Sequence, residues 1–509
     1  MILRDIIIRN SRRYPDKLAF SSADIKYTFA QFNNRVNKVV NALDHLGVNK
    51  GDRIAVLAGD CPFYPEIWWA AAKSGIVMVP LIRTLVGEDL IYIINNSQPN
   101  TLFYGDNYSE LVNSIRPQLE TVNNFIDGAK SYKNLVSSQP PEEPKTELDE
   151  DDLFCITYTG GTTGLPKGVM LTHKNILANA LGQILENRMS HEDVLLTTYP
   201  YCHAGFIYST FPPFYIGATV VGTEKFDAET ILKTIESNKV TIFYSSTDLL
   251  APVIAHAHID RYNLSSLRRI VYSGAPIPIE ILKRGIKHFG NIFAQSYGLS
   301  ECMVLTYLLP EEYAVDAPLE KMKRLGSCGR EAINTKVKVV NESGGDVAPG
   351  EVGEIIGRGD DVTKGYWRMP EATSQAIKNG YIYTGDMATV DEAGYIYMTG
   401  RKKDMIITGG KTVFPREIEE VIYRHPSVSE AAVIGMPSKE LGESVKAFVV
   451  SKKKMSATAE EIIKFCRQNL TDYAVPQSVE FVNQLPRNPL GKVLRRVLRE
   501  EYSEQKKQD

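Results

Sequence analysis

The chain of 509 residues is poor in cysteine, close to neutral and without a long apolar run. Its 6 cysteines lie at least 26 residues apart, which excludes a paired-cysteine metal or redox motif and suits a reducing compartment. A net charge of −3 gives no electrostatic basis for binding nucleic acid. The most apolar stretch, 67–82, contains a lysine and a proline and is too short to span a membrane. We therefore expect a cytoplasmic protein with no integral membrane segment and no nucleic-acid partner.

Segments typical of strands and of helices alternate through the first half of the chain. Residues 28–31 match a capping box, and the helix that begins there should end at Gly47. This alternation predicts parallel sheets covered by helices. From about 325 to about 400, short strands separated by glycines indicate a β-barrel-like or small antiparallel sheet. The charged tail from Arg495 is expected to fray.

Residues 159–167 are the most informative segment, because three glycines and three threonines precede a lysine there. Glycine leaves backbone N–H groups open to a ligand, while threonine hydroxyls and a lysine ammonium add donors that suit phosphate oxygens. Pro166 and Gly168 flank the lysine, so this is not a Walker A loop, which requires Gly-Lys-Ser/Thr. The predicted phosphate-binding residues are Thr159, Gly160, Gly161, Thr162, Thr163, Gly164 and Lys167.

Residues 295–301, Gln-Ser-Tyr-Gly-Leu-Ser-Glu, gather a ring, a hydroxyl and a carboxylate after a strand expected at 291–294. Tyr297 could stack on a base, and Ser300 could bond a phosphate oxygen. Glu301 could hold Mg²⁺, which prefers hard oxygen ligands beside substrate phosphates. A capped turn at the end of a strand is the alternative interpretation.

Four further segments each allow a functional and a plain interpretation. Residues 273–276 follow a strand, where ligands of parallel sheets bind, or form a simple turn. Residues 383–386 carry Asp386, which could bind ribose hydroxyls, or form a hairpin turn. Residues 400–411 and 486–492 place basic groups on glycine-containing loops, which in isolation are typical of a solvated surface.

Taken together, in this order and spacing, these segments resemble the AMP-forming acyl-CoA synthetases of the adenylate-forming superfamily. That superfamily includes firefly luciferases and the adenylation domains of peptide synthetases. The matching segments are 158–173, 273–276, 295–301, 383–386, 400–419, 442–450 and 486–496. The resemblance implies an α/β fold with a large N-terminal domain, 1–399, of two parallel-type sheet subdomains and a β-barrel-like subdomain. A small, mobile α+β C-terminal domain, 400–509, would follow a hinge at Lys403.

The resemblance also implies a role for each candidate residue. Residues 159–167 would surround the β- and γ-phosphates, while Ser300 would contact the α-phosphate and Glu301 would bind Mg²⁺. Asp386 and Arg401 would bind the ribose. The adenine would be framed by Gly274, Ala275, Pro276, Gln295, Ser296, Tyr297 and Gly298. The CoA channel would be lined by Gly409, Gly410 and Lys411. The catalytic residues would be Lys167, Glu301 and Lys492. Of these, Lys492 would bridge the carboxylate and the α-phosphate.

The acyl pocket is expected along residues 201–214, which contain no Asp, Glu, Lys or Arg. By resemblance its residues are His203, Ala204, Gly205 and Tyr208. An apolar pocket favours a fatty acid of medium or long chain. The chain departs from the family at Ser296, where glycine is common, at Ser300, where threonine is common, and at Ser246, where proline is usual. These departures leave the reaction intact and the choice of acid open.

The predicted activity is therefore that of an ATP-dependent carboxylate–CoA ligase. It would make an acyl adenylate and pyrophosphate, and then an acyl-CoA and AMP. Its partners would be ATP, coenzyme A and a small-molecule carboxylic acid, with Mg²⁺ as cofactor. The alternatives are an aryl or alicyclic acid as substrate, a stand-alone adenylation enzyme that loads a carrier protein, and a luciferase-like oxygenase. Assembly into a homodimer is left open.

Overall fold

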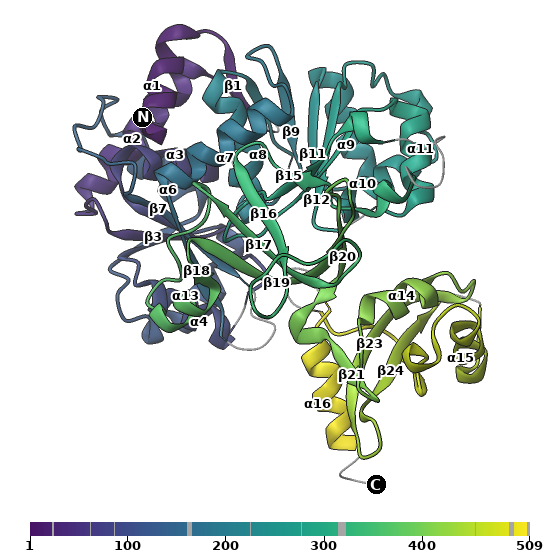
Figure 1. Ribbon diagram of the computed structural model, residues 1–509. Coiled ribbons are helices and arrows are strands. Elements are labelled where there is room, and N and C mark those ends of the chain that lie inside the picture. Colours follow the sequence, from purple (N-terminus) through teal and green to yellow (C-terminus); the bar gives the residue numbers. More distant parts are fainter. Residues whose placement is uncertain are drawn as a thin grey trace. The chain divides into compact units, whose positions relative to one another are not determined.

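The computed structural model describes residues 1–22, 25–61, 63–85, 87–159, 165–223, 225–275, 277–313, 322–452, 455–487 and 493–505. Figure 1 shows the chain coloured from its N-terminus, in purple, to its C-terminus, in yellow. Contacts divide the chain into two compact units. The first comprises Met1–Thr159, Pro166–Val337 and Gly357–Tyr383. The second comprises, in the main, Lys338–Ile356 and Thr384–Asp509.

The first unit contains a nine-stranded sheet of order β15-β14-β13-β12-β11-β9-β10-β1-β2. The pairs from β13 to β1 are parallel, whereas β2, β14 and β15 join the edges antiparallel. Its central strands are almost wholly buried, as expected for a parallel sheet covered by helices. The strands are β1 (Leu18–Ser22), β2 (Ile25–Thr28), β9 (Val194–Thr197), β10 (Thr219–Val221), β11 (Ile242–Ser246), β12 (Arg269–Ser273), β13 (Phe293–Tyr297), β14 (Thr306–Leu308) and β15 (Arg330–Glu331).

A six-stranded sheet of order β6-β5-β3-β4-β7-β8 also belongs to the first unit. Its neighbours pair in parallel except at one edge, where β7 and β8 form an antiparallel hairpin. This hairpin carries the ends of the predicted phosphate-binding segment. The strands are β3 (Arg53–Leu57), β4 (Val77–Pro80), β5 (Thr101–Tyr104), β6 (Asn124–Asp127), β7 (Leu153–Thr159) and β8 (Lys167–Thr172).

Helices connect the strands of both sheets, and the second helix begins as the sequence predicts. Thr28 Oγ1 accepts a hydrogen bond from the backbone N–H of Gln31 at 3.3 Å, and Gln31 Oε1 accepts one from Thr28 N–H at 3.0 Å. Gly47 follows the helix with φ of +75°. The helices are α1 (Leu3–Arg13), α2 (Phe29–His45), α3 (Phe63–Ser74), α4 (Gly87–Ser97), α5 (Ser109–Ile115), α6 (Gly128–Ser137), α7 (His173–Glu186), α8 (Ala204–Ile216), α9 (Ala228–Asn238), α10 (Thr247–Ala255), α11 (Ile279–Phe289) and α13 (Pro370–Ala376).

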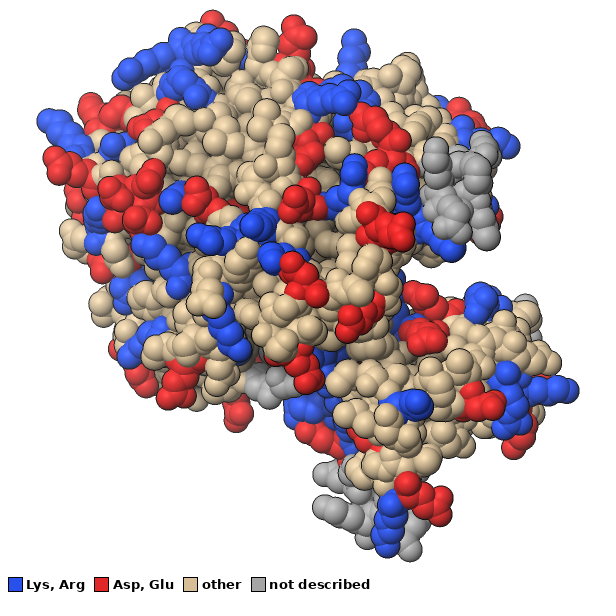
Figure 2. Space-filling view, viewed as in Figure 1, with Lys and Arg blue, Asp and Glu red and all other residues tan. Residues whose placement is uncertain are grey.

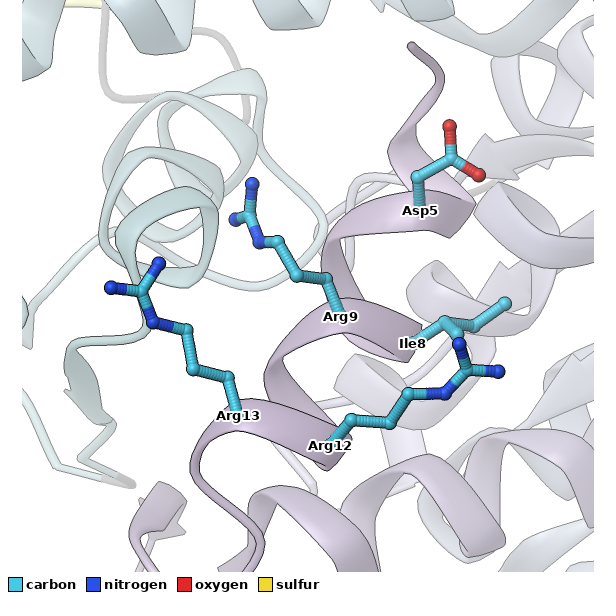
Figure 3. Close-up of a pocket in the computed structure, with 5 residues that line it drawn as sticks. All are labelled: Asp5, Ile8, Arg9, Arg12 and Arg13. Carbon is cyan, nitrogen blue, oxygen red and sulfur yellow. The ribbon is translucent and has the colours of Figure 1, made fainter.

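Helix α1 supports the C-terminal end of α8. Arg9 and Asn10 donate to the backbone carbonyls of Tyr215 and Phe214 in the last turn of α8. Figure 3 shows Asp5, Ile8, Arg9, Arg12 and Arg13 of α1. These residues line a hollow with a volume of about 510 Å³. Arg12 and Arg13 lie in the last turn of α1, where positive charge complements the helix dipole. The basic residues of this hollow therefore have a structural role.

A five-stranded sheet has the order β16-β17-β19-β18, with β20 paired to β19. It lies in the part of the sequence where a β-barrel-like subdomain is predicted. The strands are β16 (Thr335–Val340), β17 (Gly353–Gly359), β18 (Ile377–Lys378), β19 (Tyr381–Val390) and β20 (Ile396–Arg401).

The C-terminal part of the second unit contains a sheet of order β22-β21-β24-β23, with β25 beside β24. The strands are β21 (Ile406–Thr408), β22 (Lys411–Val413), β23 (Val428–Ser438), β24 (Gly442–Ser451) and β25 (Ser478–Phe481). The helices are α14 (Pro415–Tyr423), α15 (Ala459–Arg467) and α16 (Arg495–Gln505).

The expectation that the tail from Arg495 frays is wrong, because residues 495–505 form α16. Leu498 is buried in a cluster with Ile434 and Phe448. Arg495 donates to both carboxylate oxygens of Glu419, at 2.7 and 2.9 Å. These tertiary contacts stabilise the first turns of α16. The charged sequence of the segment does not indicate them.

The α/β class, with parallel-type sheets in a large N-terminal part and a smaller C-terminal part, is confirmed. The boundary between 399 and 400, the hinge at Lys403 and the mobility of the C-terminal part stay predictions. Positive and negative side chains are interspersed on the face that Figure 2 shows. Within the described residues, no helix is both long and apolar enough to cross a membrane.

Candidate functional site

The β7–β8 hairpin positions the two ends of the predicted phosphate loop. Thr159 pairs with Lys167 across the hairpin, and its hydroxyl donates to the carbonyl oxygen of Lys167 at 3.4 Å. The ammonium nitrogen of Lys167 lies 4.9 Å from the ring centroid of Tyr366, a cation–π distance. The other predicted loop residues, Gly160, Gly161, Thr162, Thr163 and Gly164, lie outside the described residues.

The strand expected at 291–294 is displaced in the structure, because β13 runs from Phe293 to Tyr297. Gln295, Ser296 and Tyr297 therefore lie within the strand rather than after it. These three residues pair antiparallel with β14. The local sequence of β13 does not reveal this pairing, because β14 lies further along the chain. Gln295 Oε1 accepts a hydrogen bond from a buried tyrosine of β12 at 3.2 Å.

After β13 the chain makes a tight turn that requires glycine at 298. A Cβ atom at this position would lie 1.9 Å from the carbonyl oxygen of Met303. The N–H of Leu305 also donates to the carbonyl of Tyr297 at 2.8 Å, closing the turn. The turn leaves Ser300 and Glu301 partly exposed, as a ligand-binding role requires.

Tyr366 connects the two charged residues that the sequence singles out. Its hydroxyl donates to Glu301 Oε1 at 2.8 Å, and its ring faces the ammonium group of Lys167. Burial, and then the charge of Glu301, raise the pKa of Tyr366, so the phenol stays protonated and remains a donor. The sequence analysis did not identify this residue. Its only local signal is a Gly-Tyr-Trp run in a region interpreted as short strands.

The segment around Tyr366 is tied to both sides of the site by its backbone. The N–H of Trp367 donates to the carbonyl of Gly168 at 2.7 Å, and Tyr366 forms a bridge with Val169 of β8. The N–H of Thr363 donates to the carbonyl of Glu301 at 2.7 Å. The hairpin and the Glu301 turn are thus held to one segment of the first unit.

Strands β11, β12 and β13 are parallel and end at one edge, where open α/β sheets bind ligands. Ser273, at the end of β12, shares a hydrogen bond of 2.6 Å with the hydroxyl of Tyr199. Gly274 follows with φ of +94°, which favours glycine, and Thr247 Oγ1 donates to the carbonyl of Ala275. Pro276 lies outside the described residues.

The predicted acyl-pocket residues lie on the first turns of α8. His203 is the N-cap, and its Nδ1 accepts from the N–H of Gly205 at 3.0 Å. Burial lowers the pKa of His203, which favours the neutral ring that this bond needs. Ala204 begins the helix. The hydroxyl of Tyr208 shares a hydrogen bond of 2.8 Å with Ser296 Oγ, so the pocket residues of α8 reach the end of β13.

In the second unit, Asp386 and Arg401 are cross-strand partners on β19 and β20. Arg401 Nε lies 2.7 Å from Asp386 Oδ1, and Asp386 is only 2% exposed. The hairpin-turn alternative for residues 383–386 is wrong, because these residues lie inside the long strand β19. Ribose binding by the pair stays a prediction.

Gly409 and Gly410 form the two-residue loop of the β21–β22 hairpin. Their φ angles are +55° and +73°, as a type I′ turn requires, and such turns favour glycine at both positions. Lys411 follows, exposed, and Lys403 lies in the 3₁₀ turn Lys402–Asp404. Lys492 lies outside the described residues.

A buried carboxyl group lies behind the Glu301 turn. Asp361 is fully buried, and neither of its carboxyl oxygens has a hydrogen-bond partner in the part of the chain that the structure describes. Burial, and then the neighbouring Asp360, raise the pKa of Asp361 to about 8. The folded protein therefore holds this group protonated at neutral pH.

We predict that Asp361→Asn increases stability, and increasingly so from pH 5 to pH 8. An unfolded aspartate ionises near pH 4. The folded state keeps its proton until about pH 8. The native protein therefore loses stability as pH rises between these values, by at most about 1.4 kcal/mol per unit, and asparagine removes this loss. Urea unfolding at pH 5, 6.5 and 8 measures the difference, and a gain that is constant with pH would contradict the assignment.

Known proteins resemble the chain over nearly its whole length. The AMP-binding enzyme family matches residues 7–367, and the AMP-binding enzyme C-terminal domain matches residues 417–492. A long-chain-fatty-acid–CoA ligase of Mycobacterium tuberculosis is 34% identical over 487 residues, covering 95% of this chain and 94% of that protein. A feruloyl-CoA synthase of an Amycolatopsis species is 32% identical over 496 residues, covering 97% and 98%. The crystal structure of ATP-bound MatB from Rhodopseudomonas palustris has a TM-score of 0.88 at 28% identity, covering 99% of each chain.

Proposed function

The chain belongs to the AMP-binding enzyme family and is an acyl-CoA synthetase, and from this premise we propose that it activates an apolar carboxylic acid at the edge where β12 and β13 end. The observation that carries the proposal is the contact of both Lys167 and Glu301 with Tyr366. An ammonium group and a partly exposed carboxylate, both in contact with one side chain, suit the phosphates and the metal of MgATP.

Magnesium fits this site. Among the described residues there is no group of three or more His, Cys, Asp or Glu side chains that could hold a metal ion. Mg²⁺ commonly takes one or two carboxylates together with substrate phosphates, so Glu301 alone is sufficient as the protein ligand. When bound, the ion would neutralise phosphate charge.

In the proposed first step, a carboxylate oxygen of the acid attacks the α-phosphorus of ATP. A new P–O bond forms, and the bond to the β-phosphate breaks, so that pyrophosphate leaves. Two anions must approach each other, and catalysis therefore depends on charge neutralisation and positioning. Lys167 would hold the β- and γ-phosphates, and Lys492 would bridge the attacking carboxylate and the α-phosphate.

In the second step, the thiol sulfur of CoA attacks the acyl carbonyl. A C–S bond forms, the C–O bond to AMP breaks and the thiol proton passes to solvent. The residues proposed for the CoA channel are Gly409, Gly410 and Lys411. A carrier-protein thiol as the acceptor is the alternative, and replacing CoA in the assay with a phosphopantetheinylated carrier protein would distinguish the two. A cytoplasmic location and a homodimer stay predictions.

A medium- or long-chain fatty acid is the first candidate substrate, because the first turns of α8 supply no charged side chain to the pocket. The M. tuberculosis relative is named for such acids. An aryl acid is the second candidate, and a specific observation favours it. Tyr208 is hydrogen-bonded to Ser296 and its ring packs 5.2 Å from that of Tyr244, so tyrosine rings lie beside the first turns of α8. The Amycolatopsis relative is named for feruloyl-CoA.

We predict that acetate is a poor substrate and that activity rises with the apolar surface of the acid. Each buried methylene contributes about 0.8 kcal/mol, or roughly fourfold in binding. Pyrophosphate release, with and without CoA, should be measured for fatty acids of increasing length and for benzoic and cinnamic acids. A preference for acetate, a dicarboxylic acid or an amino acid would contradict the proposal. The series that gives the higher rate of pyrophosphate release, fatty acids or aromatic acids, decides between the two candidate substrates.

A further inference from the structure

The carboxylate of Glu301 and the ammonium group of Lys167 each contact Tyr366 rather than each other. The side-chain contacts described for Glu301 and Lys167 both go to Tyr366, through its hydroxyl and through its ring. Both groups contact a single side chain, and no ion pair joins these two residues, both of which the structure describes. Such a pair would neutralise both charges before MgATP arrives.

The protein holds Tyr366 firmly. Its side chain is 8% exposed, its N–H donates to Thr373 Oγ1 at 2.9 Å, and its backbone bridges to Val169. Trp367 and Thr363 bind the hairpin and the Glu301 turn on either side. The Tyr366 ring is therefore fixed relative to the hairpin that carries Lys167 and to the turn that carries Glu301.

We propose that Tyr366 is a positioning residue that separates Glu301 from Lys167 and holds both ready for MgATP. This inference rests on the proposed function. The phenol orients one carboxylate oxygen of Glu301 by donating to it, and the other oxygen would be available to hold Mg²⁺. The ring gives the ammonium group a weak cation–π contact that phosphate oxygens displace at little cost. A direct ion pair would have to be broken at each binding event.

The test is a double-mutant cycle on MgATP binding. The full-length protein, without acid or CoA, is titrated with ATP by calorimetry at saturating and at limiting Mg²⁺. Tyr366→Phe keeps the ring and removes the hydroxyl, and should weaken MgATP binding by about 10-fold or more, the scale for a hydrogen bond to a charged group. In a Glu301→Gln background the same change should cost less than about 2-fold, because the group through which it acts has lost its charge.

Tyr132→Phe is the matched control. Tyr132 is also buried and donates to a glutamate, Glu66, at 2.7 Å, but it lies on α6 and contacts no predicted site residue. It should lower the melting temperature and leave MgATP binding unchanged. If Tyr366→Phe behaves like this control, or weakens binding equally in both backgrounds, the positioning role is overturned. If the wild-type protein fails to bind MgATP at all, the proposed function fails instead.

Discussion

Replacing Glu301 with glutamine is expected to slow acyl-adenylate formation by about 10²-fold, the scale for removing an electrostatic contact in a transition state. Glutamine has nearly the same shape, and its amide oxygen can still accept from the hydroxyl of Tyr366, so the turn should keep its structure. The lost quantity is the negative charge that would hold Mg²⁺. The Mg²⁺ concentration at half-maximal rate should therefore rise, as measured by pyrophosphate release in a Mg²⁺ titration.

Glu186→Gln provides a matched control for this prediction. Glu186 lies in α7 of the same unit and accepts from the N–H of Ile333 at 2.7 Å, a structural contact. Its replacement should lower stability somewhat without moving the Mg²⁺ curve. A Glu301→Gln variant that melts at a lower temperature, yet keeps the wild-type rate and Mg²⁺ dependence, would show that Glu301 is structural and not a metal ligand.

Short-range features of the fold could be predicted from the sequence. The capping box at Thr28 and Gln31 involves residues three apart, and both of its hydrogen bonds are present. Gly47 follows the same helix with φ of +75°, as its predicted end at that glycine requires. In each case the residues that determine the structure lie within one turn, so pattern and structure agree.

Features that depend on distant contacts could not be predicted. The end of β13 is set by its pairing with β14, and α16 depends on an ion pair between Arg495 and Glu419. Tyr366 became recognisable only when the structure placed it against Glu301, 65 residues away. Sequence reasoning identified the charged members of the site by their chemistry. It missed the tyrosine between them, because buried tyrosines are common and their partners are not visible in sequence.

The two half-reactions are expected to respond in opposite ways to changes at Lys492 and Gly409. Lys492→Ala removes the cation proposed to bridge the carboxylate and the α-phosphate, so adenylation should fall by about 10²-fold or more. The variant should still convert a supplied acyl adenylate to the thioester, because that step involves no approach of two anions. Single-turnover assays of each half-reaction, with ATP or with synthetic acyl adenylate, measure the two rates separately.

Gly409→Leu should form the adenylate and then stall, because a branched side chain would obstruct the proposed pantetheine channel. The effect of an obstructed channel can be separated from the effect of backbone strain at residue 409. Among the described residues, a Cβ atom at 409 would meet only Leu441, at an ordinary 3.7 Å, so the cost within the fold comes from the φ of +55°. Asparagine tolerates this conformation, and Gly409→Asn should therefore retain more thioester formation than leucine. These predictions follow from the proposal that the mobile C-terminal domain brings the Lys492 loop to the site for adenylation and the Gly409 loop for thioester formation. Equal damage to both half-reactions in the Lys492 and Gly409 variants would contradict that proposal. Loss of thioester formation in Gly409→Asn as severe as in Gly409→Leu would assign the effect to the hairpin rather than to the channel.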